Sequence, residues 1–245
     1  MSRSNPQTNT PNPATRWFEW NGELGIVRYY DKEAKQNVEC GSDFTFLLLD
    51  QLGTVGGWHD ASDSGIYSNE VRDSRQEAMV VKAFKGGVVA EGVYRDIKDR
   101  VNAAGGQFVA NCYIAFKNGG DGLAIGSLKF KGAALHAWTE FTKAHRADVY
   151  KKAVRIHGFS EGKKGRIVYR VPELKLVELT EQTNADALAL DKELQEFLSG
   201  YFKRTKKDQA EAPPAQHVRD EDMDPPPPSD HDAPQDIDDF DTVPF

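Results

Sequence analysis

The sequence predicts a mainly β domain with some helix: a five-stranded antiparallel barrel with helical insertions and a C-terminal helix. Two observations favour this fold. Short apolar runs bounded by glycine recur along the chain, whereas only three segments have a helical period. A glycine-rich stretch between two of the longest runs also has the composition of a hairpin turn. A β-sandwich is the main alternative, because it produces the same pattern of short strands.

The strands are predicted from seven apolar runs, at 24–31, 43–52, 77–84, 106–117, 122–131, 153–160 and 165–179. The glycines of "KNGGDG" (117–122) allow positive φ and predict a hairpin, and "SEGKKG" (160–165) predicts a second one. Among small barrels, this pattern favours the Greek-key form of the oligonucleotide-binding (OB) fold.

Three helices are predicted at 91–106, 132–145 and 184–202, each with one apolar face. Ile97 and Val101 mark that face in the first helix, and Leu135 and Trp138 mark it in the second. The third helix carries Leu194 on its apolar face and either packs on its own barrel or forms a dimer seam. The oligomeric state is therefore left open.

The chain divides into a disordered N-terminal arm (1–15), a folded domain (16–203) and a disordered acidic, proline-rich tail (204–245). Residues 208–245 hold twelve acidic residues and one arginine, a charge of −11. Residues 1–207 hold 30 Lys and Arg against 26 Asp and Glu, a charge of +4. A basic body thus precedes a tail of opposite sign.

The composition points to the cytoplasm. No run of about 18 apolar residues is long enough to span a membrane, and the polar N-terminus lacks the apolar region of a signal peptide. Cys40 and Cys112 are far apart and lack the spacing of a zinc site, which favours a reduced, cytoplasmic protein.

We expect no enzyme activity, cofactor or metal, because phosphate-binding loops, nucleophile elbows and zinc-protease motifs are missing from the sequence. The densest polar cluster, "GGWHDASDSGIYSNEVRD", is interpreted as a loop of ordinary turn formers. The alternative is a metal-dependent nuclease that uses Asp60, Asp63 and Glu70.

A barrel that binds single-stranded nucleic acid needs flat rings for the bases and cations for the phosphates on one strand face. Aromatic and basic residues share the outward face of several predicted strands, as Arg28 and Tyr30 do. The predicted DNA-binding residues are Arg28, Tyr30, Trp58, Lys82, Asn111, Tyr113, Lys117, Lys129, Lys131, Lys151, Lys152, Arg155, Lys163, Lys164, Arg166 and Arg170. The rings of "RWFEW" (16–20) either plug the barrel end or form a stacking platform.

The last residues, "DIDDFDTVPF", resemble the C-terminal tip of bacterial and bacteriophage single-stranded DNA-binding proteins. Thr242 and Val243 separate the acids from Pro-Phe, which departs from the shortest bacterial form. The body is more similar in length and in its extra helices to the larger phage-encoded members. For a phage-encoded chain, the expected compartment is the bacterial host cytoplasm. The resemblance implies an OB barrel, a role in replication, recombination or repair, and partner proteins that dock on the tip residues Asp238, Asp239, Phe240, Asp241, Val243, Pro244 and Phe245.

The sequence therefore predicts a protein that coats single-stranded DNA without sequence specificity. Two alternatives remain at this level: the nuclease, and an acidic DNA mimic that inhibits a host enzyme. The charge of +4 on the body argues against the mimic.

Overall fold

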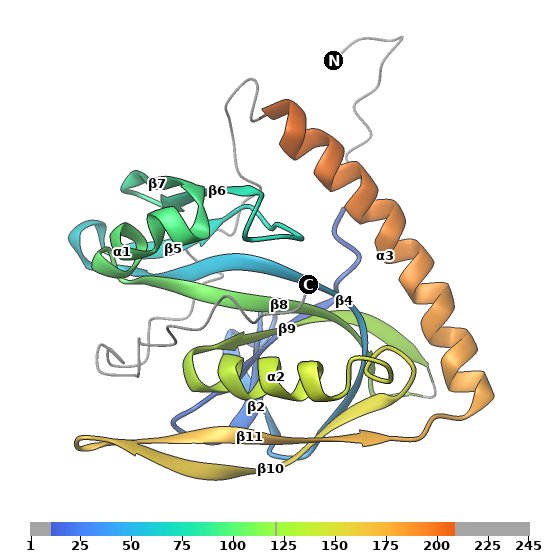
Figure 1. Ribbon diagram of the computed structural model, residues 1–245. Coiled ribbons are helices and arrows are strands. Elements are labelled where there is room, and N and C mark those ends of the chain that lie inside the picture. Colours follow the sequence, from blue (N-terminus) through green and yellow to red (C-terminus); the bar gives the residue numbers. More distant parts are fainter. Residues whose placement is uncertain (1–10, 121, 209–245) are drawn as a thin grey trace, which may run out of the picture.

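The computed structural model describes residues 11–120 and 122–208, with side chains to Thr205, and contains eleven strands and three α-helices in that part of the chain (Figure 1). The strands are β1 (Arg16–Asn21), β2 (Ile26–Asp31), β3 (Gln36–Gly41), β4 (Phe44–His59), β5 (Ser64–Ser68), β6 (Ala78–Ala83), β7 (Gly87–Val93), β8 (Gly106–Lys117), β9 (Leu123–Lys131), β10 (Ala153–Lys164) and β11 (Ile167–Val177). The helices are α1 (Tyr94–Ala103), α2 (Gly132–Ala144) and α3 (Glu181–Asp208), and a 3-10 turn spans Asp60–Ser62.

The long strand β4 organises one mixed sheet. Its first residues pair with β10, its middle pairs with β8, and its last residues pair with β5. The order across the sheet is β3-β2-β1-β9-β8-β4-β5-β6-β7, with β10 and β11 joined to it through β4. Between the described strands, β1 and β9 pair in parallel and the other pairs are antiparallel.

The mainly β prediction is confirmed, but the sheet is not a closed five-stranded barrel. Strand β1 lies beside β9. The turn that follows β1 contacts β11, since the Arg170 amide donates to the Gly22 carbonyl at 2.7 Å and Trp20 Nε1 donates to the Arg170 carbonyl at 2.9 Å. Strand β1 and the turn after it thus contact both β9 and β11. Strand β1 was not predicted, because the consecutive Trp17 and Phe18 break the alternation of apolar and polar residues that marks a strand.

The main core fills the concave side of the sheet, and α2 packs into it. Trp138 is fully buried, stacks on Phe130 with ring centroids 4.9 Å apart, and donates its indole hydrogen to Gln51 Oε1 at 2.7 Å. Helix α1 covers the same side of the sheet at β6, β7 and β8 through Ile97 and Val101, which are 1% and 0% exposed. Both helices were predicted from these apolar faces.

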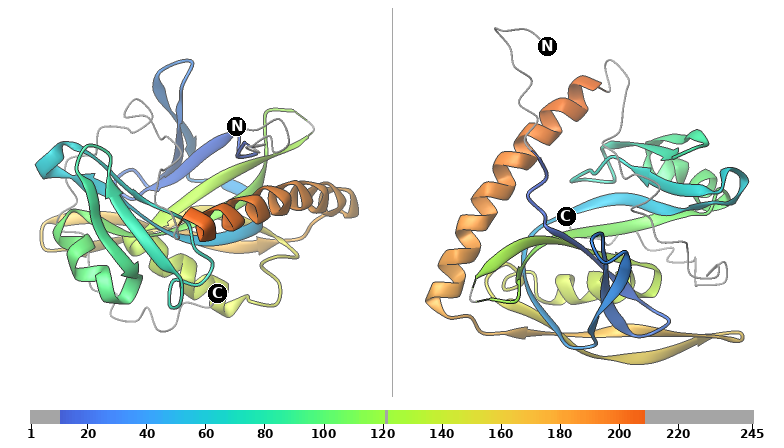
Figure 2. Two further views of the ribbon diagram at one scale, coloured as in Figure 1. Left: turned by 90° about the horizontal axis from the view of Figure 1, so that it is seen from above. Right: turned by 180° about the vertical axis from the view of Figure 1, so that it is seen from behind.

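Helix α3 packs on the opposite, convex side of the sheet, as two views show (Figure 2). Leu194, Phe197 and Leu198 are at most 3% exposed and contact a cluster that includes Leu52 and Tyr113. Of the two roles predicted for this helix, the structure shows that its apolar face packs on its own domain. The described part of α3 extends to Asp208, six residues beyond the predicted end.

The chain ends differ from the predicted boundaries where the structure describes them. Residues 11–15, expected in the disordered arm, contact the sheet: Ala14 is 5% exposed, and the Thr15 amide donates to the Ile125 carbonyl at 2.8 Å. The predicted tip at Asp238–Phe245 lies outside the described residues. In the described part of the chain, no helix is long and apolar enough to cross a membrane.

Candidate nucleic-acid interface

On the convex side of the sheet, six of the seven neighbouring strands from β2 to β6 carry accessible aromatic or basic side chains, and β8 contributes Gln107. The register fixes which residues share this side. Trp17 lies beside Ser127 on β9, and Lys129 and Lys131 follow Ser127 at alternate positions of that strand. Farther along the same side, Tyr67 of β5 pairs with Lys82 of β6. We call this surface the outer face; its members are Trp17, Tyr30, Trp58, Tyr67, Lys82, Phe84, Gln107, Lys129 and Lys131.

The outer face combines rings with cations. Trp17 and Phe84 are 45% and 40% exposed, and Lys129 and Lys131 are also exposed. With strands about 4.8 Å apart, the six steps from β2 to β6 span roughly 29 Å. Rings and cations spaced along such a path match what the bases and phosphates of a single strand require.

Local environment changes the pKa of two outer-face groups. Burial raises the pKa of Tyr67, which stays neutral and can stack or donate a hydrogen bond. Partial desolvation lowers the pKa of Lys129, while the carboxylates of Glu70 and Glu19 oppose that shift. A phosphate beside Lys129 would favour the charged form further.

Part of the convex side is not available, because α3 and the segment 69–77 cover it. Asn111 and Tyr113 were predicted as DNA contacts, but they are 4% and 2% exposed. Asn111 Nδ2 donates to Glu70 Oε1, and the Tyr113 hydroxyl donates to Glu70 Oε2 at 2.9 Å. Strand alternation correctly put both side chains on the convex side. Glu70 and α3 pack over both side chains and bury them. The alternation within one strand cannot predict this packing by distant segments.

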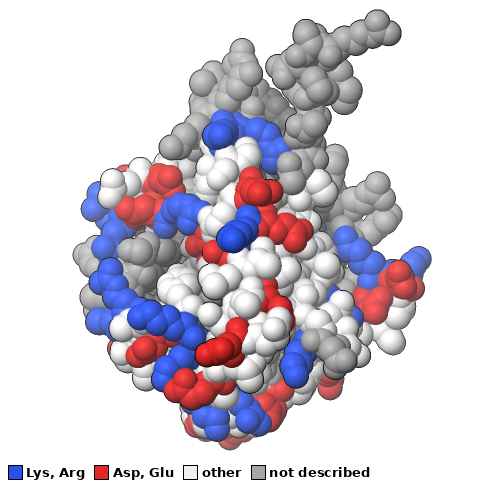
Figure 3. Space-filling view, turned by 90° about the vertical axis from the view of Figure 1, so that its right-hand side faces the viewer, with Lys and Arg blue, Asp and Glu red and all other residues white. Residues whose placement is uncertain are grey.

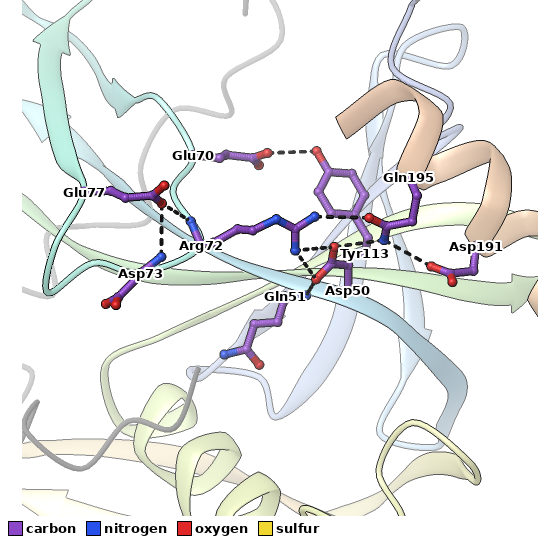
Figure 4. Close-up of polar contacts among 9 residues, drawn as sticks. All are labelled: Asp50, Gln51, Glu70, Arg72, Asp73, Glu77, Tyr113, Asp191 and Gln195. Atoms are coloured by element: carbon purple, nitrogen blue, oxygen red, sulfur yellow. Dashed lines mark hydrogen bonds and ion pairs between the residues drawn. The ribbon is translucent and has the colours of Figure 1, made fainter. Parts of the chain in front are cut away.

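A second set of polar contacts fixes α3 over the sheet (Figure 4). Arg72 bonds to Asp50 at 2.9 Å and donates to Gln195 Oε1 at 3.1 Å. Gln195 Nε2 in turn donates to Asp50 Oδ2 at 3.0 Å. The three side chains come from β4, the 69–77 segment and α3, so they hold these elements in one arrangement.

Glu70 lies in the same 69–77 segment and bonds to Asn111 and Tyr113 of β8. Burial raises its pKa, and the hydrogen bonds from Tyr113 and Asn111 only partly oppose that effect. Burial also raises the pKa of Tyr113 and of Tyr201, whose hydroxyl accepts from the Glu70 amide at 2.7 Å. The network is a structural one, since its polar groups are satisfied by each other.

Acidic side chains run down the middle of the face that carries α3, and Lys and Arg border them on the left of the view (Figure 3). The exposed acids of α3 include Glu181, Asp186, Glu193 and Glu196. A nucleic acid would therefore be repelled by the exposed side of α3 and pass beside it.

Four of the predicted cations hold ion pairs within the domain. Arg28 bonds to Glu19 at 2.6 Å on the convex side. The other three pairs are Lys152 with Glu178 at 2.5 Å, Arg155 with Asp43, and Arg170 with Glu161 at 3.1 Å. These arginines and lysine already have an anionic partner, which reduces their expected contribution to phosphate binding.

The remaining predicted cations lie away from the outer face. Lys163, Lys164 and Arg166 are exposed at the turn of the β10–β11 hairpin. Lys117 ends β8, and Lys151 precedes β10; both are exposed. The structure thus brings Tyr30, Trp58, Lys82, Lys129 and Lys131 onto one surface and places the hairpin cations on another.

Three outer-face rings were missing from the predicted set. Trp17 belongs to "RWFEW", whose rings divide between two environments: Phe18 and Trp20 are buried in the core, and Trp17 is 45% exposed. Phe84 shares a face with Lys82, which the alternation of that strand already indicated. Tyr67 could not be found, because β5 was interpreted as part of a loop.

The carboxylates of the nuclease alternative do not converge. Asp60 and Asp63 lie at the turn between β4 and β5, whereas Glu70 bonds to Asn111 and Tyr113. Over residues 11–120 and 122–208, no group of three or more His, Cys, Asp or Glu side chains is placed to hold a metal ion.

Comparison with known proteins gives no relative. No family model matches the chain, and neither a curated protein nor a solved structure is similar to it at a significant level.

Proposed function

We propose that this protein binds and coats single-stranded DNA without sequence specificity, and that it has no catalytic role. The observation that carries the proposal is the outer face, where Trp17 lies beside the strand of Lys129 and Lys131, and Tyr67 pairs with Lys82 next to Phe84. Stacking on rings and phosphate contacts with lysines tolerate any base sequence.

The strand order supports the finer proposal of an OB-type barrel. Strands β9, β8, β4, β10 and β11 are neighbours in that order, and α2 connects β9 to β10. These are the strand order and helix position of a five-stranded Greek-key barrel of this type, here with β1 inserted beside β9. In such barrels, oligonucleotides cross the outside of the second and third strands, which correspond to β8 and β9.

The charge division supports a second part of the proposal. The tail competes with DNA for the basic body, because its charge of −11 is tethered to the domain at a high effective concentration. Its tip recruits replication, recombination or repair proteins: Phe245 and Val243 suit an apolar slot, and the aspartates suit a basic one. If removal of the tail left the affinity for DNA at low salt unchanged or weaker, the competition would be refuted.

A mobility-shift experiment tests the proposed function. Full-length protein is incubated with an oligo-dT strand, with EDTA in one series and magnesium in another. The expected result is a shifted, intact strand in both series. Cleavage with magnesium, or binding that EDTA abolishes, would favour the metal-dependent nuclease instead.

A further inference from the structure

An exposed apolar patch lies where the β10–β11 hairpin meets the turn after β1. Leu24, Phe159 and Val168 are 47%, 38% and 46% exposed. The β10–β11 register puts Phe159, Val168 and Arg170 on one side of the hairpin. Leu24 lies in the adjacent turn, between Glu23, whose carbonyl accepts from Arg170, and Gly25, which approaches both Phe159 and Arg170.

The patch is held in a fixed shape. A Cβ atom at Gly25 would lie 2.6 Å from Phe159 and from Arg170, so the turn can approach these side chains only as glycine, at φ +70°. The Arg170 guanidinium lies 5.3 Å from the centre of the Phe159 ring, and its Nη1 donates to the Glu23 carbonyl. Phe159 is thus clamped from two sides and still keeps an exposed surface.

The patch is basic at the end of the hairpin, whereas the exposed Glu23 lies beside Leu24. Lys163, Lys164 and Arg166 are exposed at the end of the same hairpin. The nearby Glu161 is paired with Arg170 at 3.1 Å, so its charge is already compensated. A ligand that fits this surface is acidic and has a large apolar group.

We propose that the C-terminal tip of the same chain, Phe240–Phe245, docks on this patch. The inference extends the proposed role of the tip as a docking peptide. The tip contains two phenylalanines and Val243, aspartates on its N-terminal side and a terminal carboxylate. Its apolar groups contact Leu24, Phe159 and Val168, and its carboxylates contact Lys163 and Arg166. Lys163 and Arg166 would then hold the tip on a surface separate from the outer face.

The chain is long enough to reach the patch. Thirty-seven residues follow Asp208. They span up to about 120 Å when extended, whereas a domain of about 200 residues has a radius of gyration of roughly 16 Å. An intramolecular tip also has a high effective concentration, which compensates for a small contact area.

Photo-crosslinking of the full chain tests this docking without DNA. The variant Val168→p-benzoylphenylalanine is irradiated, digested and analysed by mass spectrometry. The matched control is Val88→p-benzoylphenylalanine, since Val88 is also an exposed valine in a strand (60% exposed) and lies on β7. The expected result is a crosslink from position 168 to residues 238–245 within one chain, with little from position 88.

Two charge and anchor variants complete the test. Phe245→Ala with Val243→Ala, and separately Lys163→Glu with Arg166→Glu, should each lower the crosslink yield by about tenfold, because few contacts carry most of the binding in a small interface. A crosslink only between two chains, equal yields from positions 88 and 168, or yields that these variants do not change would each overturn the proposal. If position 168 disturbs folding, Leu24→p-benzoylphenylalanine gives the same readout.

The proposed function can fail independently of this proposal. If the chain crosslinks as expected but does not bind oligo-dT, the proposed DNA coating is refuted and the docking proposal stands. A chain that binds oligo-dT without the crosslink refutes the docking alone.

Discussion

Replacing Lys129 and Lys131 together by glutamine should weaken single-stranded DNA binding and make it less sensitive to salt. Both side chains are exposed on the outer face of β9, where alternate residues are about 6.6 Å apart, so they can contact separate phosphates. Each phosphate contact with a single strand contributes a slope of about −0.7 to the dependence of log K on log salt concentration. Loss of two contacts should therefore reduce the slope by about 1.4 and the affinity near 0.1 M salt by roughly 25-fold.

Fluorescence anisotropy with a labelled dT oligonucleotide, repeated across a salt series, measures both quantities. The control is the variant Lys143→Gln with Lys192→Gln, which removes the same charge from exposed positions on α2 and α3. The control should keep most of the slope, because these lysines lie outside the outer face. An unchanged slope in the Lys129/Lys131 variant, with a normal circular dichroism spectrum, would refute the assignment of phosphate contacts to the outer face.

Three further predictions concern the rings, the buried carboxyl and α3. Trp17→Ala should weaken oligo-dT binding by about 1–3 kcal/mol, as the loss of one base stack does, and leave the unfolding temperature nearly unchanged, since Trp17 is 45% exposed; titration with thermal melting checks both. Burial raises the pKa of Glu70 above its unfolded value near 4.3, so the folded state loses stability as pH rises from about 4 through the raised pKa. Urea unfolding at pH 4, 6 and 8 measures this effect. The free energy of unfolding of Glu70→Gln should rise relative to that of the wild type as pH increases, by about 1.4 kcal/mol for each unit by which the Glu70 pKa is raised. A difference between the two proteins that stays constant with pH would contradict this. Leu194→Ala should lower the free energy of unfolding by about 2–5 kcal/mol in the same assay, because Leu194 is 0% exposed between α3 and the sheet; a loss below about 1 kcal/mol would show that α3 is held by its polar contacts alone.

The sequence predicted the elements whose side chains follow a regular period. Strand β8 was predicted with the bounds that the structure has, 106–117, and all three helices were located by their apolar faces. The period fails where strands are short, polar or at the sheet edge. Strands β3 and β7 have few buried side chains, and β5 lies among serines, so local pattern gave no signal for them.

The sequence predicted the types of residue on the candidate site but not which of them remain accessible. Alternation put Tyr30, Lys82, Lys129 and Lys131 on outward faces, and the pairing of strands then joined those faces into one surface. The sequence pattern does not show which distant segments pack over a strand and bury its outward side chains. Strand alternation places Asn111 on the outward face just as it places Lys129. In the structure, however, the Asn111 side chain donates a hydrogen bond to Glu70, forty-one residues earlier in the sequence.

The most direct test of the central claim is a binding titration of the full-length chain and of a chain ending at Thr205, on single-stranded and double-stranded DNA at several salt concentrations. We predict tighter binding to the single strand than to the duplex, affinities that fall as salt rises, and tighter binding of the shorter chain at low salt. Absence of binding by both chains, or a preference of both for the duplex, would contradict the proposal that this protein coats single-stranded DNA.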